Sequence, residues 1–260
     1  MNSLSAQKLL WEQQIKNEYL KYQKFIGSDN MPKYKINFVD GSKRKISYAM
    51  EALIYKRPVI LNVNMGFMIN GQSKHCQPTL YHEFTHMLDS ENLFKDKDPK
   101  ERKSVLALYT EYHASQIEFL RFMEFKSING IKCINPSSKF YEFDEEKTVL
   151  EYYNKRCSLL SESIDKYNSN ASTENYRAII DSYMYVFGIK SIYDKVIKMI
   201  ELPQVDCLFH EKVIGLYSIL QDNNVNDLWD ILLLCSQVLD KTYIVDSLQL
   251  KNYMKGNQHQ

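Results

Sequence analysis

The sequence predicts an α+β fold, with a small β-sheet in the first half of the chain and a largely helical second half. Three observations point to this class. Short alternating or apolar runs, which are typical of strands, occur before residue 65. After residue 78, apolar residues recur mostly at helical spacing. Glycine occurs 8 times and proline 6 times among 260 residues, whereas 13% are aromatic, and this balance favours packed helices.

The first 64 residues predict one helix followed by three strands. Residues 4–25 form an amphipathic helical pattern that ends at a glycine and several polar residues. Residues 34–39 and 45–48 alternate between polar and apolar side chains on either side of Asp40-Gly41, so we expect a β-hairpin. Residues 58–64 are rich in valine, isoleucine and leucine and predict the third strand.

Helices dominate the expected structure after a loop at residues 66–77. The next helix opens at Pro78 or Thr79, because proline fits the first turn of a helix and threonine can cap it. This helix is expected to end near Asp89-Ser90. Further helices are expected at residues 101–125, 145–167, 173–200, 209–222 and 226–239.

A boundary between the two halves is expected near residue 130. Turn signals occur at Asn129-Gly130 and at residues 135–138, between a long predicted helix and the helical remainder of the chain. We therefore expect one domain at residues 1–130 and an α-helical domain or extension at residues 131–260. The two halves can share one core.

Charge and composition exclude several classes of partner. The formal net charge is +1, so no overall field favours nucleic acid or an anionic membrane surface. No apolar stretch approaches the roughly 20 residues that span a bilayer, and the first residues lack the pattern of a signal peptide. The 5 cysteines include no CxxC pair, which favours a reducing cytoplasm over a disulfide framework. We expect a cytoplasmic protein, and the sequence predicts no oligomeric state.

The strongest chemical signal is the segment His82-Glu83-Phe84-Thr85-His86, an HExxH motif on a predicted helix. Residues four positions apart lie on one helix face, so both imidazoles can bind the same metal ion. Glu83 lies beside them, and we predict that it acts as the catalytic general base and not as a ligand. The motif is typical of zinc hydrolases, so the expected cofactor is Zn²⁺.

A catalytic zinc ion requires a third protein ligand, for which the sequence offers two carboxylates. Asp89 lies on the histidine face, but it follows His86 by only three residues and is poorly placed to complete the site. It can instead hydrogen-bond a ligand histidine. Glu111 lies on a later helix that can fold back, on a face of mostly small residues. We therefore favour Glu111 as the ligand and keep Asp89 as the alternative.

Two further residues on the helix of Glu111 have more than one interpretation. Glu118 either supports a ligand histidine or is an exposed helix glutamate. His113 follows Glu111 by two residues, so it is expected to point away from it and to be packed or at the surface.

The HExxH motif with a downstream Glu111 resembles the gluzincin type of zinc peptidase, in which a glutamate on a later helix completes the metal site. The segment Glu111-Tyr112-His113-Ala114 is similar to the E-x-x-A segment of compact ImmA/IrrE-like peptidases. The HExxHxxD run that ends at Asp89 also resembles the inner-membrane assembly peptidases of mitochondria.

The resemblance covers roughly residues 58–120, and the sequence departs from it in places. Ile117 and Glu118 stand where the ImmA/IrrE pattern prefers an aromatic residue and alanine, and no metzincin-type third histidine follows His86. The resemblance implies a zincin-like catalytic domain within residues 1–130, and the HExxH motif in its helix context predicts a protein or peptide as the substrate.

The expected function is therefore hydrolysis of peptide bonds by a zinc-dependent metallopeptidase. The alternative is a metal-bound regulatory or protein-interaction module, in which the helical half binds a partner and catalysis is dispensable. The two hypotheses differ in whether Glu83 is needed for function.

Overall fold

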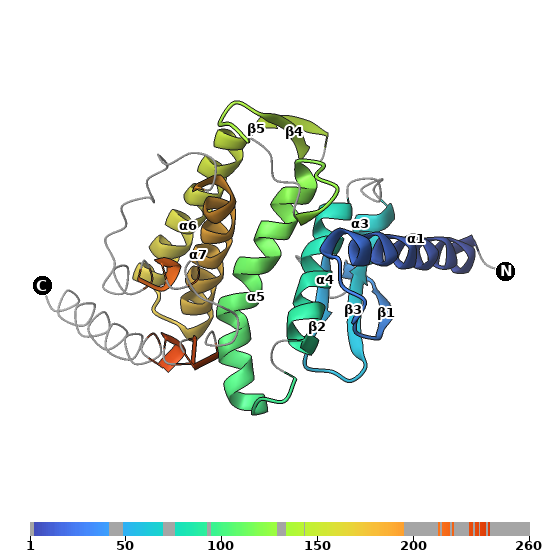
Figure 1. The fold of residues 1–260 in the computed structure, drawn as a ribbon, viewed down its shortest axis with the longest axis horizontal. Helices are drawn as coiled ribbons and strands as arrows, with labels where there is room; N and C mark the ends of the chain where they lie inside the picture. The colour runs from blue at the N-terminus through green and yellow to red at the C-terminus, as the bar shows by residue number, and fades with distance from the viewer. Residues whose placement is uncertain are drawn as a thin grey trace, which may run out of the picture. The chain divides into compact units, whose positions relative to one another are not determined.

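A computed structural model describes residues 3–41, 49–69, 76–92, 95–128, 134–142 and 144–194, with single residues and short stretches between 213 and 239. The helices are α1 (Ser3–Ile26), α3 (Met65–Ile69), α4 (Gln77–Asn92), α5 (Pro99–Phe122), α6 (Val149–Ser169) and α7 (Thr173–Asp194) (Figure 1). The strands are β1 (Tyr34–Val39), β2 (Met50–Leu53), β3 (Val59–Asn64), β4 (Lys139–Glu142) and β5 (Glu145–Thr148). Small sheets among many helices confirm the predicted α+β class.

Contacts within the chain divide it into two compact units. Unit 1 comprises residues 1–95 and 113–148, and unit 2 comprises residues 96–112 and 149–260. The division crosses α5, so this helix contributes to both units. It therefore does not coincide with a single boundary near residue 130, because the first half of α5 is grouped with unit 2 and the β4–β5 hairpin with unit 1.

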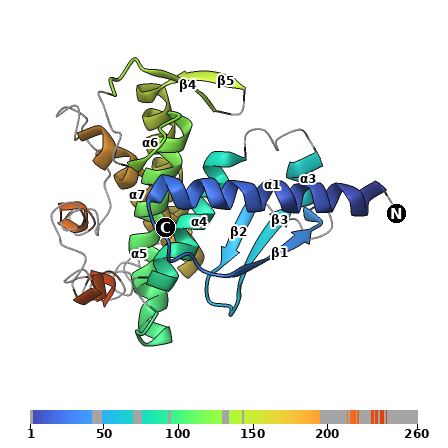
Figure 2. The same cartoon turned by 45° about the vertical axis from the view of Figure 1, so that its right-hand side comes forward.

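Unit 1 contains a three-stranded sheet in the order β1-β3-β2 (Figure 2). β1 runs parallel to β3, with Tyr34 opposite Val59. β2 runs antiparallel to β3, with Met50 opposite Val63. In the central strand β3, the side chains of Val59, Leu61 and Val63 are at most 1% exposed. An apolar run of this kind takes the middle of a sheet because it can bury both of its faces.

Residues 42–48 lie outside the described part of the chain, so the structure does not describe the second strand of the hairpin predicted between residues 34–39 and 45–48. Among the described residues, β1 pairs with β3, and β3 pairs on its other side with β2. An alternating pattern identifies a half-exposed strand but not its neighbour, and here the more apolar β3 lies between the two.

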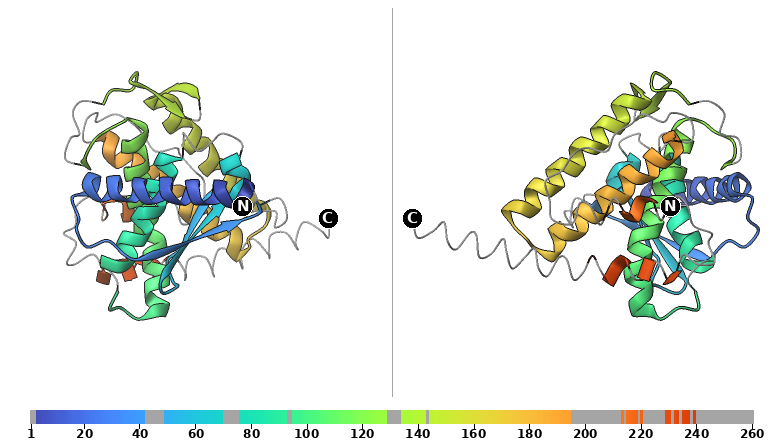
Figure 3. Two further views of the ribbon diagram at one scale, coloured as in Figure 1. Left: turned by 90° about the vertical axis from the view of Figure 1, so that its right-hand side faces the viewer. Right: turned by 60° about the vertical axis from the view of Figure 1, so that its left-hand side comes forward.

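The helix α1 lies across α4 and the sheet (Figures 2 and 3), and aromatic side chains hold it there. Tyr22 of α1 and Phe84 of α4 are fully buried, with ring centroids 5.5 Å apart. The Tyr22 hydroxyl lies 3.0 Å from the Thr85 hydroxyl. Trp11 packs against Phe38 of β1 at 5.9 Å. Each buried aromatic ring contributes on the order of 2–3 kcal/mol, so α1 fixes one face of α4 firmly.

The helices that flank the motif differ slightly from the prediction. α4 begins at Gln77, close to the predicted start, and continues to Asn92, beyond the predicted end. Residues 65–69, expected to be the start of a loop, form the short helix α3 with Met68 buried. Burial of Met68 removes nearby backbone N–H and C=O groups from water. A helical turn supplies the hydrogen bonds that these groups then need.

Unit 2 is built on the antiparallel pair α6 and α7, which lie side by side (Figure 3). Tyr152 and Leu160 of α6 and Tyr183 and Phe187 of α7 are fully buried. These residues recur at helical spacing, so the sequence predicts both helices correctly.

The start of α6 differs from the prediction, and most residues after α7 lie outside the described part of the chain. The helix expected from residue 145 begins at Val149, because residues 145–148 form β5 and pair with β4. The turn between these strands contains Asp144 with a φ of 71°, a conformation that aspartate tolerates better than most residues. The helices expected at residues 209–222 and 226–239 lie largely outside the described residues.

The described helices include none that is both long and apolar enough to cross a bilayer. Cys76, Cys157 and Cys235 are present as thiols, and Cys133 and Cys207 lie outside the described residues. Burial raises the pKa of the Cys76 thiol to about 12, so this thiol is protonated at neutral pH.

Candidate metal centre

The helix α4 places both histidines of the HExxH motif on one side of a buried segment. His82 is 8% exposed and His86 is half-buried, and their ring centroids lie 4.6 Å apart at an interplanar angle of 87°. Leu80, Phe84 and Met87 are at most 1% exposed and anchor the helix in the core of unit 1. The imidazoles therefore project from a helix that cannot easily rotate.

Glu111 of α5 completes a group of three potential ligands with His82 and His86. Each of the three residues offers one donor atom, and these atoms all lie within 4.8 Å of one another. Donors bound to one zinc ion at about 2.1 Å in tetrahedral geometry lie roughly 3.4 Å apart, so small rotamer changes suffice to close the group. Two imidazoles and one carboxylate form a donor set that a divalent metal ion accepts. The group can hold a metal ion, and its donors do not by themselves identify the metal.

Glu83 is held by the backbone of the neighbouring strand. The N–H of Ala52 in β2 donates a hydrogen bond of 2.7 Å to Glu83 Oε2. The residue is 8% exposed, although it is charged. A buried carboxylate needs such a partner, and the bond also restricts the orientation of the carboxylate beside the two histidines. No sequence pattern predicts this contact, because any residue of β2 can supply a backbone N–H.

Glu118 lies behind His82. Its Oε2 is 3.4 Å from His82 Nδ1, and both side chains are about nine-tenths buried. The two atoms form no hydrogen bond in this geometry, but a carboxylate so near Nδ1 favours the tautomer that carries its proton there, which directs Nε2 to a metal ion. Of the two interpretations of Glu118, the structure favours support of a ligand histidine over an exposed helix glutamate.

Asp89 does not belong to the ligand group and pairs instead with His113. Its two carboxylate oxygens lie 2.9 Å and 3.1 Å from His113 Nδ1. Burial by itself lowers the pKa of His113, but the attraction and the hydrogen bond of Asp89 outweigh this effect and raise it. Asp89 was expected to contact a ligand histidine if it did not bind the metal. In the structure the aspartate, which is 2% exposed, has His113 of α5 as a hydrogen-bond partner.

The Asp89–His113 pair also affects the position of Glu111. It joins α4 to α5 within unit 1, and Glu111 lies two residues before His113 on the same continuous helix. Ala114 and Ser115, which belong to the predicted small-residue face of α5, are fully buried. The pair and this face therefore fix the helical turn that carries Glu111.

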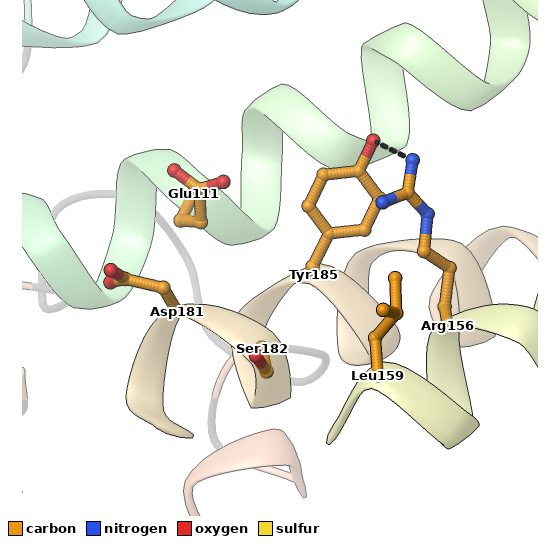
Figure 4. A pocket seen from close by; sticks show the side chains of 6 residues that line it. All are labelled: Glu111, Arg156, Leu159, Asp181, Ser182 and Tyr185. Atoms are coloured by element: carbon orange, nitrogen blue, oxygen red, sulfur yellow. Dashed lines mark hydrogen bonds between the residues drawn. The ribbon is translucent and has the colours of Figure 1, made fainter. Parts of the chain in front are cut away.

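Glu111 also lines a cavity of about 150 Å³ on unit 2, which the sequence did not predict. The other lining residues come from α6 and α7, namely Arg156, Leu159, Asp181, Ser182 and Tyr185 (Figure 4). No motif spacing connects these residues with the HExxH segment, because their proximity depends on the pairing of α6 with α7. His75, His210 and His259, the remaining histidines of the chain, lie outside the described residues.

Comparison with known proteins gives no relative from which a function could be transferred. No protein-family model matches the chain, and no curated protein and no solved structure matches it significantly. A function for this protein must therefore be inferred from the geometry of the site.

Proposed function

We propose that this protein is a zinc-dependent metallopeptidase that hydrolyses peptide bonds. The observation that carries the proposal is the ligand group of His82, His86 and Glu111, with Glu83 on the same helix as the histidines. Catalytic zinc sites use three protein ligands and keep one position for water or substrate, and this donor set matches that requirement. Among zinc peptidases, the order of the ligands resembles the gluzincin type.

In this proposal, each residue of the site has one role. A zinc ion held by His82, His86 and Glu111 supplies the Lewis acidity that activates water and stabilises negative charge. Glu83 accepts the proton of the attacking water while the oxygen bonds to the scissile carbonyl carbon. Glu83 then donates this proton to the nitrogen of the leaving amine as the C–N bond breaks. The hydrogen bond from Ala52 N–H keeps the Glu83 carboxylate in the orientation that both transfers need.

The first test measures metal content and activity separately. Protein purified without a metal-affinity tag is expected to contain about one zinc ion per chain, and His82→Ala is expected to lose it. Glu83→Gln should keep the zinc and lose hydrolysis of unfolded casein by about 10²-fold or more. Glu162→Gln, the same change at an exposed position of α6, serves as the control and should leave both unchanged.

Two results would contradict the proposal. Absence of bound zinc under zinc-replete conditions would exclude the metal site. Full casein hydrolysis by Glu83→Gln at normal zinc content would exclude the catalytic role of Glu83. If Glu83→Gln also retained the function of the protein in cells, a metal-bound interaction module would be the better interpretation.

A further inference from the structure

The cavity that Glu111 shares with α6 and α7 has the size of a small substrate group. Its volume is about 150 Å³, and all of its lining residues lie in unit 2. A cavity of roughly this volume holds a molecule the size of benzene. The space therefore fits one side chain or one terminal residue, and not a folded partner or a nucleic-acid strand.

Arg156 is held rigidly at one end of this cavity. Its Nη2 donates hydrogen bonds to the hydroxyl oxygens of Tyr152 at 3.0 Å and Tyr185 at 3.1 Å. Its Cζ lies 4.1 Å from the ring centroid of Tyr185 and 5.0 Å from that of Tyr152. Stacking and hydrogen bonds together fix the plane of the guanidinium group. An arginine that is already fixed loses little side-chain entropy when it binds a ligand. This favours a ligand-binding role for Arg156 over that of an ordinary surface charge.

The charges that line the cavity are separated along its length. Figure 4 shows Glu111 and Asp181 on one side and Arg156 on the other, with the ring of Tyr185 between them. When a metal ion is bound, the charge of Glu111 is offset by that ion. Asp181 is exposed, so water screens its charge more strongly than that of the half-buried Arg156. The cavity is therefore best suited to one anionic group at its Arg156 end.

Arg156 Nη2 donates both of its N–H groups to the tyrosine hydroxyls and Nε is buried, so a ligand would be bound by Nη1 through a charge-assisted hydrogen bond, and a carboxylate is the anion that a peptide ordinarily carries. We propose that this cavity is a substrate subsite in which Arg156 binds a carboxylate of the peptide, either the C-terminal carboxylate or an acidic side chain. Arg156 is then a residue that determines specificity. This inference rests on the proposed peptidase function, because Glu111 is the residue that links the cavity to the metal centre.

The test measures peptide binding by calorimetry in the zinc-loaded Glu83→Gln chain, in which hydrolysis is slow. The probes are an N-acetylated alanine tripeptide with a free C-terminal carboxylate, the same tripeptide as its amide, and an N-acetylated Ala-Glu-Ala amide. We expect at least one carboxylate probe to bind about tenfold or more tightly than the neutral amide. A preference for the free acid identifies C-terminal recognition, and a preference for the glutamate peptide identifies side-chain recognition.

Substitutions then assign this preference to the cavity. Arg156→Gln should reduce the preference to within about twofold, and Arg156→Lys should retain only part of it, because lysine has one nitrogen and cannot bond both tyrosine hydroxyls and a ligand in the same geometry. Arg177→Gln removes the same charge at an exposed position of α7 outside the cavity and should retain the full preference. Zinc content is measured for every variant and should not change.

Two outcomes would overturn the inference. The first is equal binding of all three probes, or no binding at millimolar concentration. The second is a preference that survives in Arg156→Gln, and its disappearance in His82→Ala would then show that the carboxylate binds the metal. If the zinc analysis finds no metal, the peptidase function fails, whereas the comparison of Arg156→Gln with the starting chain still reports on the cavity.

Discussion

The helix α4 and the helix pair α6–α7 hold their polar residues in different ways. On α4, His82, Glu83 and Asp89 are each at least nine-tenths buried, and each faces a specific partner. On α6 and α7, the cavity residues Arg156 and Tyr185 are half-buried and are held by stacking and hydroxyl hydrogen bonds.

This difference predicts whether a substitution in each region changes the free energy of folding, the free energy of binding, or both. A buried polar group that loses its partner destabilises the fold as well as the site, because its desolvation is no longer offset. A half-buried group that loses its partner can turn to water. We therefore expect changes on α4 and its contacts to alter metal binding, catalysis or folding, depending on the partner that is lost, and changes in the cavity to alter ligand binding alone.

The largest effect is expected at Glu111, which belongs to both the ligand group and the cavity. Glu111→Ala should lose bound zinc and reduce hydrolysis of unfolded casein by about 10³-fold or more, because two histidines alone hold zinc weakly. Asp181→Ala removes a carboxylate from the same cavity and should retain the zinc. Elemental analysis of both purified variants measures their zinc content per chain. Normal zinc content in Glu111→Ala would contradict the role of Glu111 and favour Asp89 as the third ligand.

The next effect is expected at Glu118, which acts on the metal through His82. Glu118→Ala should weaken zinc binding roughly 10- to 100-fold, since a carboxylate behind a ligand histidine raises its basicity and fixes its tautomer. Glu118→Gln should have a smaller effect, because the amide oxygen can still accept the Nδ1 proton. Competition with a chelator of known affinity measures the zinc affinity of each variant. Equal zinc affinity in the unchanged chain, Glu118→Ala and Glu118→Gln would show that Glu118 contributes only to packing.

A smaller effect, on stability alone, is expected at Asp89. Asp89→Asn should lower the free energy of unfolding by about 1–3 kcal/mol, because the buried side chain keeps its shape but loses its ionic attraction to His113. Zinc content should stay at its normal value. Urea denaturation gives the free energy, with the exposed Asp165→Asn as the control. Loss of zinc in Asp89→Asn without loss of stability would contradict the structural role.

The smallest effect is expected at Tyr185. Tyr185→Phe keeps the ring that stacks on Arg156 and removes one of two hydroxyl acceptors, while the bond to Tyr152 remains. The preference for carboxylate over amide probes should fall by about two- to fivefold, and zinc content should not change. Calorimetry with the same tripeptides measures the change. A loss of zinc here would show that the cavity and the metal site do not respond independently.

Several parts of this structure could be predicted from the sequence because they depend on neighbouring residues within a single helix or strand. The helix α1, the central strand β3 and the helices α4 to α7 all appear close to their predicted positions, since apolar periodicity is a local property. The two histidines of the HExxH motif lie one turn apart for the same reason. These features required no knowledge of the distant chain.

The tertiary structure decided the features that depend on residues far apart in the sequence. The pairing of β1 with β3 could not be predicted, because alternation is a property of one strand and pairing is a property of two. The placement of Glu111 with the histidines, and of Asp89 against His113, depends on how α5 packs on α4. Helical spacing alone left both carboxylates open as ligands.

The HExxH helix, with Glu83 beside its two histidines, was thus determined by the sequence itself, because an α-helix converts a spacing of four residues directly into a shared face. The grouping of Glu111 with the two histidines, the backbone partner of Glu83 and the cavity around Arg156 depend on the tertiary structure alone. Each of them joins side chains or backbone groups from separate elements, and packing, rather than local periodicity, brings those elements together.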